Sequence, residues 1–195
     1  MNIMKTLVID TETTGLPPRS KKEIVNPLNS LDEWEKCRIV EIAWILYEDG
    51  ILIQKESYIV QPHFYIIPFL STKIHGITQE KAKEDGIPFE LILNKLKQDV
   101  LISDVVVAHN MEFDYNVILS EWFRYDKNTY DIWKNINKKC TMKDYLKNPY
   151  DKWPRLQDLY YKCFGKFPLE SHRALADAMA CGEIYFYNEK INILN

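Results

Sequence analysis

The fold class is indicated most clearly by one stretch of the sequence, Lys5-Thr6-Leu7-Val8-Ile9-Asp10-Thr11-Glu12. Its apolar and β-branched residues predict a buried β-strand over Lys5–Thr11. Side chains two residues apart on a strand point to the same face, so Asp10 and Glu12 project together where this strand ends. Adjacent carboxylates repel each other, and one takes up a proton unless a cation lies between them. Most such pairs are solvated strand ends, so the other motifs decide whether this one has a function.

A second acidic motif, His109-Asn110-Met111-Glu112-Phe113-Asp114, follows a predicted buried strand at Asp104–Ala108. Sites in open α/β sheets form at the carboxyl ends of strands, which is where both Asp10 and Asp114 are expected. The histidine and asparagine are expected to form the turn and the N-cap before a helix. Structural roles are also open for two residues of this motif. Asp114 could serve only to stabilise the positive end of the helix dipole from the first turn, and Phe113 could serve only in core packing.

The third motif is His172-Arg173-Ala174-Leu175-Ala176-Asp177, in which His172 is expected just before or at the start of the last predicted helix. Its alanines allow a close approach to the sheet, which could bring Asp177 to the other carboxylates. A lone histidine before a helix is more often a capping or surface group, but His172 also suits a general base near neutral pH. Together the motifs offer four carboxylates and one histidine that could converge on a pair of divalent metals, which is the chemistry of phosphodiester hydrolysis.

The segments between the motifs alternate strand and helix signals. A hairpin is expected over Ile39–Tyr47 and Ile51–Val60, because Glu48-Asp49-Gly50 is a turn signal. Residues 17–38 are polar and form one long insertion loop, a type of segment that is often functional or mobile. The expected helical segments are a short piece around Leu31–Lys36, a short helix capped by Thr78, a helix from Pro88 with Phe89, Leu93, Leu96 and Val100 on one stripe, a helix from Asn110 to about Phe123, pieces within 126–147, and the helices Arg155–Phe164 and His172–Tyr187. This order predicts an α/β sheet with helices on its faces.

Composition indicates an ordinary globular protein. The chain has 195 residues, 46% hydrophobic and 27% charged, which suits a single domain over residues 1–195. The four cysteines show no C-x-x-C spacing, no leader sequence is evident and no apolar run approaches a membrane span. We therefore expect reduced, mostly buried thiols in an intracellular, cytoplasmic protein without a membrane partner.

The net charge of −3 does not indicate a nucleic-acid binder, but basic residues cluster locally. Between Lys134 and Arg155 the two acids Asp144 and Asp151 are outnumbered by seven basic residues, Lys134, Lys138, Lys139, Lys143, Lys147, Lys152 and Arg155. Such a run is usually a solvated helical surface. Contact with a phosphate backbone is the alternative, because a phosphate-cleaving site is expected nearby.

The three motifs resemble those of the DEDDh 3′–5′ exonucleases, the family of the proofreading epsilon subunit of bacterial DNA polymerase III. Val8–Leu16 is similar to the first motif of the family, His109–Asp114 to the second, and His172–Asp177 to the histidine form of the third. The segment Ile74-His75-Gly76-Ile77-Thr78 is also similar to relatives. The insertion loop is longer than in compact members. The resemblance implies a ribonuclease H-like fold with a central mixed five-stranded sheet flanked by helices.

The resemblance also implies roles. Asp10, Glu12 and Asp177 would bind one metal, Asp10 would also serve a second with help from Asp114, and His172 would take the proton from the attacking water. Oxygen ligands favour two Mg²⁺ or Mn²⁺ ions over zinc. The residues expected to hold the 3′-terminal nucleotide are Thr13, Leu16, Ile74, His75 and Phe113.

The leading hypothesis is a metal-dependent 3′–5′ exonuclease that releases nucleoside 5′-monophosphates from single-stranded or frayed 3′ ends of DNA. An exoribonuclease of the same family is the alternative, because the residue facing the 2′-hydroxyl is not evident from sequence. A non-catalytic nucleic-acid-binding module is the remaining reading, which the intact acidic motifs disfavour. A polymerase partner is possible in this family, but no clamp-binding segment indicates one here.

Overall fold

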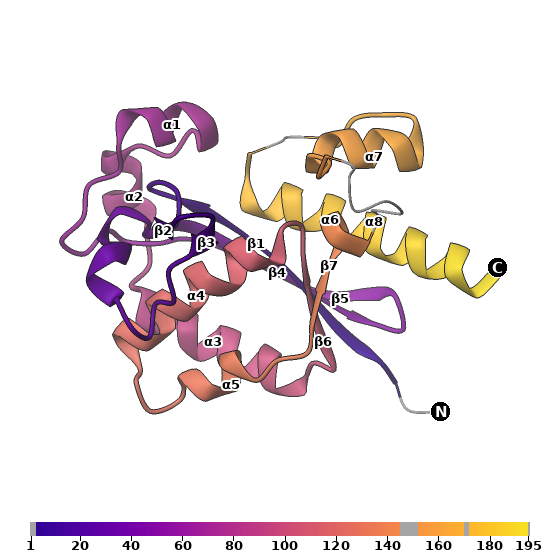
Figure 1. The fold of residues 1–195 in the computed structure, drawn as a ribbon, viewed down its shortest axis with the longest axis horizontal. Coiled ribbons are helices and arrows are strands. Elements are labelled where there is room, and N and C mark those ends of the chain that lie inside the picture. The colour runs from indigo at the N-terminus through magenta and orange to yellow at the C-terminus, as the bar shows by residue number, and fades with distance from the viewer. Residues whose placement is uncertain (1–2, 145–151, 170–171, 195) are drawn as a thin grey trace.

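The computed structural model describes residues 3–144, 152–169 and 172–194. A five-stranded sheet in the order β5-β4-β1-β6-β7 forms its centre (Figure 1). The strands are β1 (Lys5–Thr13), β4 (Ile39–Glu48), β5 (Ile51–Ile59), β6 (Val105–Ala108) and β7 (Lys138–Cys140). The first three pair antiparallel, whereas β6 runs parallel to β1 and β7 parallel to β6. The predicted mixed five-stranded sheet flanked by helices is confirmed.

The register brings three chain segments to one edge of the sheet. Val8 of β1 pairs with Val107 of β6 in parallel, so both strands run toward the same edge, with β6 ending at Ala108 and β1 continuing to Thr13. Glu12 pairs with Glu41 in the antiparallel ladder, so β4 begins where β1 ends. The carboxyl end of β1, the turn after β6 and the start of β4 therefore meet at this edge, where α/β sheets commonly bind ligands.

Helices cover both faces of the sheet (Figure 1). Val8 packs against Ala178 and Cys181 of the last helix on one face, whereas Leu7 and Ile9 belong to the core on the other face. The helical elements are η1 (Leu31–Lys36), α1 (Phe69–His75), α2 (Gln79–Asp85), α3 (Phe89–Ile102), α4 (Met111–Tyr125), α5 (Tyr130–Lys134), α6 (Thr141–Asp144), α7 (Leu156–Phe164) and α8 (Ala174–Leu194). Helix α8 packs on β1 and β4 and is covered by α7, while α3 and α4 pack on the opposite face. The alternation of apolar residues along β1 thus serves both layers.

Several local predictions are confirmed. Thr78 caps α2, because its hydroxyl accepts the Lys81 N–H at 3.1 Å. The predicted apolar stripe of α3 is buried. The β4–β5 hairpin turns through Asp49 and Gly50, which have φ values of 49° and 80° and so provide the left-handed turn that the strand twist favours.

Other predictions need correction. Asn110 occupies the N-cap position of α4, but its side chain makes no capping hydrogen bond; it provides a left-handed turn with φ of 65°. The last helix, predicted over His172–Tyr187, is α8 over Ala174–Leu194; His172 lies just before it, one of its two expected placements, with φ of 66°. Residues 138–140, expected to be helical, form β7, because Val106 of β6 offers an unpaired edge to Lys138. Helix α1 was not predicted at all.

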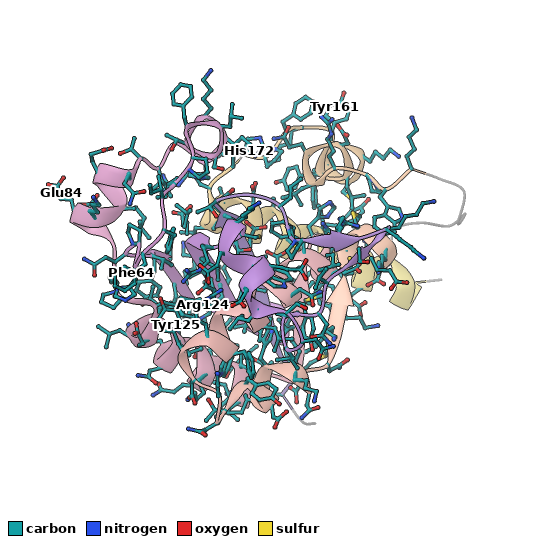
Figure 2. The ribbon with its side chains drawn as sticks, turned by 60° about the vertical axis from the view of Figure 1, so that its left-hand side comes forward. Phe64, Glu84, Arg124, Tyr125, Tyr161 and His172 are labelled. Atoms are coloured by element: carbon teal, nitrogen blue, oxygen red, sulfur yellow. The ribbon has the colours of Figure 1, made fainter. Side chains whose placement is uncertain are left out.

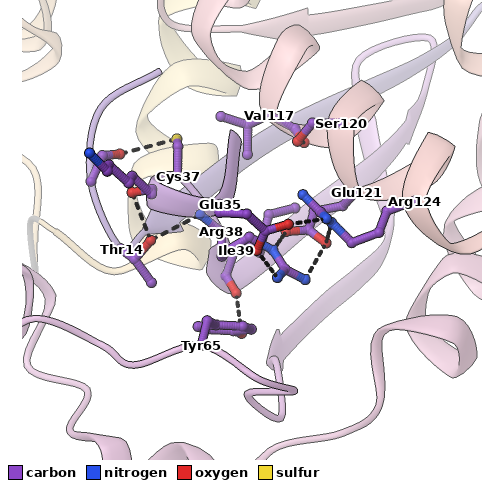
Figure 3. A network of polar contacts seen from close by, with 12 residues as sticks. Thr14, Glu35, Cys37, Arg38, Ile39, Tyr65, Val117, Ser120, Glu121 and Arg124 are labelled. Atoms are coloured by element: carbon purple, nitrogen blue, oxygen red, sulfur yellow. Dashed lines mark hydrogen bonds and ion pairs between the residues drawn. The ribbon is translucent and has the colours of Figure 1, made fainter. Parts of the chain in front are cut away.

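The insertion loop is held against the end of β1 by polar contacts (Figure 3). It contains η1 as predicted, and also a small hairpin of β2 (Arg19–Ser20) and β3 (Glu23–Ile24), which was not predicted. The Thr14 N–H donates to the carbonyl of Arg38 at 2.9 Å, and the Cys37 thiol lies 3.2 Å from the carbonyl of Gly15. The side chain of Trp34 is fully buried. The loop therefore supports the strand end that carries the first motif.

The cysteines are free thiols, three of them buried and Cys163 partly buried, as predicted. None of the described helices has the length and apolar character needed to cross a membrane. Lys147 and Asp151 of the basic segment lie outside the described residues.

Candidate active site

The acidic residues of all three motifs converge at the shared edge of the sheet. Asp10 and Glu12 point from β1 to the face that α8 covers, and ligand atoms of Glu12, His172 and Asp177 lie within 4.8 Å of one another. Asp114 reaches the group from the first turn of α4, where the Thr11 hydroxyl donates to its Oδ1 at 2.8 Å. Residues far apart in sequence thus form one cluster.

Burial and mutual repulsion raise the pKa values of these carboxyl groups. Desolvation is the largest cause at Asp10, whose pKa rises well above its ordinary value, and the charge of Asp114 is the next. The pKa of Glu12 rises to about 8 through burial and the charge of Asp177. Burial raises the pKa of Asp114 to about 7, although the Thr11 hydrogen bond opposes the shift. Such groups favour a proton or a cation in the cluster.

His172 lies beside the cluster on the turn before α8. The start of α8 lies between α1 and α7 in Figure 1, and Figure 2 labels His172 there. Its backbone N–H donates to Asp177 Oδ2 at 3.1 Å, and its side chain is exposed. The imidazole is therefore placed to reach both solvent and the carboxylates, as a general base requires.

Glu41 is a residue of this site that the sequence-based prediction missed. It lies opposite Glu12 on β4, is 1% exposed, and receives hydrogen bonds from the Arg173 guanidinium and the Ala174 N–H. Its charge also raises the pKa of Glu12. The available signal was a single acid inside the otherwise apolar run of Ile39–Tyr47, because an acid in such a run is rarely buried without a partner.

Two further histidines lie close to the motifs. His75 is 3% exposed, its Nδ1 accepts the Ile77 N–H at 3.1 Å, and its Nε2 has no hydrogen-bond partner within the described part of the chain. Burial lowers the pKa of His75. His109 bridges the hydroxyl of Thr141 at 2.9 Å and the carbonyl of Pro154 at 3.1 Å. It therefore has a structural role in the turn after β6, as predicted.

The predicted nucleotide-binding residues differ in exposure. Leu16 is 81% and Ile74 is 58% exposed, while Phe113 is half-buried against the main core. The hydroxyl of Ser71 donates to the carbonyl of Thr14 at 2.7 Å and so ties α1, which carries Ile74, to the chain beside Leu16. The Thr13 hydroxyl donates to the Gly15 carbonyl at 2.7 Å and shapes the same turn. These contacts hold the segments that carry the exposed side chains of Leu16 and Ile74 next to each other.

The donor set fits divalent metal ions. Within residues 3–144, 152–169 and 172–194, no lysine or arginine forms an ion pair with Asp10, Glu12, Asp114 or Asp177. Four desolvated carboxylates that form no ion pair with a lysine or arginine of these described residues suit a hard cation, and oxygen ligands are those that Mg²⁺ and Mn²⁺ prefer.

Curated proteins similar to this chain include epsilon subunits of bacterial DNA polymerase III. The chain is 31% identical over 126 residues to the DNA polymerase III subunit epsilon of Rickettsia prowazekii, a match that covers 62% of this chain and 45% of the relative. The Buchnera aphidicola subunit epsilon is 27% identical over 95% of this chain and 73% of the relative. The chain spans less than half the length of the first of these relatives.

A solved structure shares the fold. Escherichia coli exonuclease I in complex with a dA16 oligonucleotide superposes with a TM-score of 0.72 at 19% identity, covering 96% of this chain and 41% of that chain. The predicted ribonuclease H-like fold is thereby confirmed. The RNase_T family model, described as Exonuclease, matches residues 7–185 and so contains all three motifs. The chain therefore belongs to the RNase_T exonuclease family.

Proposed function

We propose that this chain is a metal-dependent 3′–5′ exonuclease, formed by one domain over residues 1–195, that releases nucleoside 5′-monophosphates from the 3′ end of DNA. The convergence of Asp10, Glu12, Asp114 and Asp177 beside His172, in a member of an exonuclease family, carries the proposal. The raised carboxyl pKa values support it, because the ionised carboxylates repel one another unless a bound cation neutralises their charge.

The four carboxylates would hold two divalent ions, with Asp10, Glu12 and Asp177 at one and Asp10 and Asp114 at the other. Bound Mg²⁺ or Mn²⁺ would supply charge neutralisation of the phosphate and acidification of a water molecule. Thr11 fixes the Asp114 carboxylate by its hydrogen bond. The N–H of His172 fixes Asp177 in the same way. The chain thus presents preoriented oxygen atoms, which lowers the cost of assembling the site.

His172 would accept the proton of the attacking water, because its exposed imidazole lies beside Glu12 and Asp177. Leu16, Ile74 and Phe113 would pack against the terminal base and sugar, since apolar and aromatic groups stack bases without reading sequence. The Nε2–H of His75, for which the described residues offer no hydrogen-bond partner, would donate to the same nucleotide. Thr13 would shape the turn beneath it.

Single-stranded DNA is the proposed substrate. A solved neighbour is an exonuclease I with a dA16 oligonucleotide, and the curated relatives are subunits of DNA polymerase III. RNA is the competing substrate, because a hydrogen-bonding contact to the 2′-hydroxyl decides between the two. Association with a polymerase is proposed only by analogy with the epsilon relatives.

The test uses 5′-labelled single-stranded DNA, duplex DNA and RNA of one sequence, each incubated with Mg²⁺, Mn²⁺ or a chelator. We expect shortening from the 3′ end of DNA with either metal, release of nucleoside 5′-monophosphates and no reaction with chelator or with a 3′-blocked strand. Faster shortening of RNA would establish the exoribonuclease alternative. Binding of all three polymers without cleavage would contradict the proposal and favour a binding module.

The roles of His172 and Asp177 can be separated. His172→Ala should lower turnover by about 10²–10⁴-fold, the usual range for a lost general base, while Mn²⁺ binding measured by calorimetry stays nearly intact. Asp177→Ala should lose both turnover and Mn²⁺ binding, since it removes a ligand. The reverse pattern would mean that the two roles are assigned to the wrong residues.

A further inference from the structure

We propose that Glu41 and Arg173 act as a positioning pair that holds the His172 turn over the acidic cluster. The inference rests on the proposed function, because it assigns the pair an effect on the general base. Neither residue is a catalytic residue in this scheme. Both act through the backbone that follows His172.

The contacts between the two residues form a closed bidentate pair. Arg173 Nη2 donates to Glu41 Oε1 at 2.6 Å, and Arg173 Nε donates to Glu41 Oε2 at 3.0 Å. The Ala174 N–H donates to the same Oε2 at 3.0 Å. Glu41 thus binds both residues that follow His172. A guanidinium in fork geometry and a backbone N–H fix direction as well as distance.

Burial makes this anchor rigid. The Glu41 side chain is 2% exposed on β4, which lies between β5 and β1 in the sheet, whereas the Arg173 side chain is 46% exposed. Carboxylates on well-packed strands move little, so the turn is held by the sheet rather than by the loop before it. Ala174 is the first residue of α8, where a carboxylate also complements the positive end of the helix dipole.

The turn itself needs such support. His172 has φ of 66°, a left-handed conformation that a residue with a Cβ adopts only when its surroundings hold it. One side is held by the bond from its own N–H to Asp177, and the other by Glu41. Without the second anchor, we expect the imidazole to leave the cluster for part of the time and turnover to fall accordingly.

An electrostatic role is the competing explanation. Glu41 raises the pKa of Glu12 and Arg173 lowers it, so either residue could act by altering the charge of the metal site. Glu41→Gln and Arg173→Gln separate the two explanations, because both break the ion pair but change the local charge in opposite directions. Both variants should fold, since Arg173 can reach solvent and Glu41→Gln removes a charge from an acidic cluster.

We expect each variant to lower kcat by roughly 10–100-fold, the range typical of residues that orient active-site groups, with little change in KM. Arg173→Lys should recover part of the loss, since it keeps the charge without the fork. In the His172→Ala background the same changes should have almost no further effect, because the group they position is gone. Arg124→Gln, which breaks the outer ion pair with Glu35, is the matched control and should leave kcat unchanged.

Opposite changes of kcat in Glu41→Gln and Arg173→Gln would overturn the proposal in favour of the electrostatic explanation. Equal losses with and without His172 would also overturn it. Amide hydrogen exchange of metal-free protein gives a readout without activity: the His172 amide should exchange faster in both variants than in the wild type. If the wild type has no nuclease activity, the proposed function is wrong, but amide exchange still tests whether Glu41 and Arg173 hold the turn. Unchanged exchange of the His172 amide in both variants would refute the positioning role.

Discussion

Two clusters of buried charge lie at the same edge of the sheet, and they are built in opposite ways. Around Arg38 the charges are paired: its guanidinium binds Glu121 at 2.5 Å and Glu35 at 3.3 Å, and Arg124 binds both acids (Figure 3). In the candidate active site, Asp10, Glu12, Asp114 and Asp177 repel one another. The charge of Glu121 and that of Asp114 both act on Cys37, so the clusters are neighbours.

The presence or absence of basic partners distinguishes a cluster with a structural role from a cluster with a proposed catalytic role. The buried acid Glu121 of α4 has a fixed basic partner in Arg38, and this pair anchors the end of the insertion loop to α4. Losing either member leaves an unpaired buried charge. Buried acids that lack such a partner weaken the folded state of the metal-free protein, and we propose that they are retained in order to bind a cation. Substitutions in the two clusters should therefore have opposite effects on stability.

The largest expected effect is the loss of activity in Asp10→Ala. This carboxylate faces all the others, so its removal should abolish nuclease activity and the heat of Mn²⁺ binding in titration calorimetry. In the presence of a chelator, the melting temperature should stay the same or rise, because a repelling charge is gone. A wild-type calorimetric signal in this variant, or a lower melting temperature in chelator, would show that the comparison is wrong.

Glu121→Ala should behave in the opposite way. It leaves the buried guanidinium of Arg38 without its closest partner, and breaking a buried pair in this way costs about 3–5 kcal/mol of unfolding free energy. Urea unfolding with and without Mg²⁺ measures the loss, which should be the same in both. Asp114→Asn is the matched control and should not destabilise the metal-free protein. Equal losses in both variants would remove the distinction between the clusters.

The pH dependence of stability follows from the raised pKa values. Folded Glu12 and Asp114 lose their protons at pH of about 8 and about 7, whereas unfolded carboxyl groups do so near pH 4. Between these values the folded protein binds more protons than the unfolded chain, so the unfolding free energy of metal-free protein should fall as pH rises from about 4 to about 8. Added Mg²⁺ should reverse this trend, because it binds the ionised form. Thermal melts over this range, with and without chelator, test both statements.

The smallest expected effect concerns a third charged region, the groove between α4 and β7. This groove has a volume of about 530 Å³, and its charged and aromatic lining residues are Tyr115, Lys138, Lys139 and Lys143 together with the acids Glu112 and Asp144. The Lys138 ammonium lies 3.6 Å from the centre of the Tyr115 ring. Positive charge beside aromatic rings suits a single-stranded backbone, so we expect this groove to hold the strand behind the scissile nucleotide.

Changing the three lysines to glutamine should raise KM severalfold on long strands and reduce its salt dependence, by about 0.7 in log–log slope for each lost phosphate contact. Hydrolysis of a nitrophenyl ester of thymidine monophosphate should hardly change, because that substrate has no upstream phosphates. Lys134→Gln is the control, since this lysine pairs with Asp131 outside the groove. No change on either substrate would mean that the lysines are a solvated surface.

The sequence by itself determined the central strand and the acidic motifs. The apolar run before Asp10 can be buried only as a strand, and the two-residue period then places Asp10 and Glu12 on one face. The hairpin, the capped helix after Thr78 and the buried stripe of α3 likewise depend on local patterns. These features could be predicted because each is determined by residues that are close together in the sequence.

Features that depend on partners distant in sequence could not be predicted and became evident only from the tertiary structure. Lys138–Cys140 has no strand pattern and becomes β7 because β6 has an open edge. Glu41 is buried because Arg173, 132 residues away, reaches it. The left-handed turn at His172 depends on contacts from both sides, which no local residue preference encodes. A buried charge or a strained turn is stable only when the rest of the fold supplies its partner, and that partner is known only once the chain has folded.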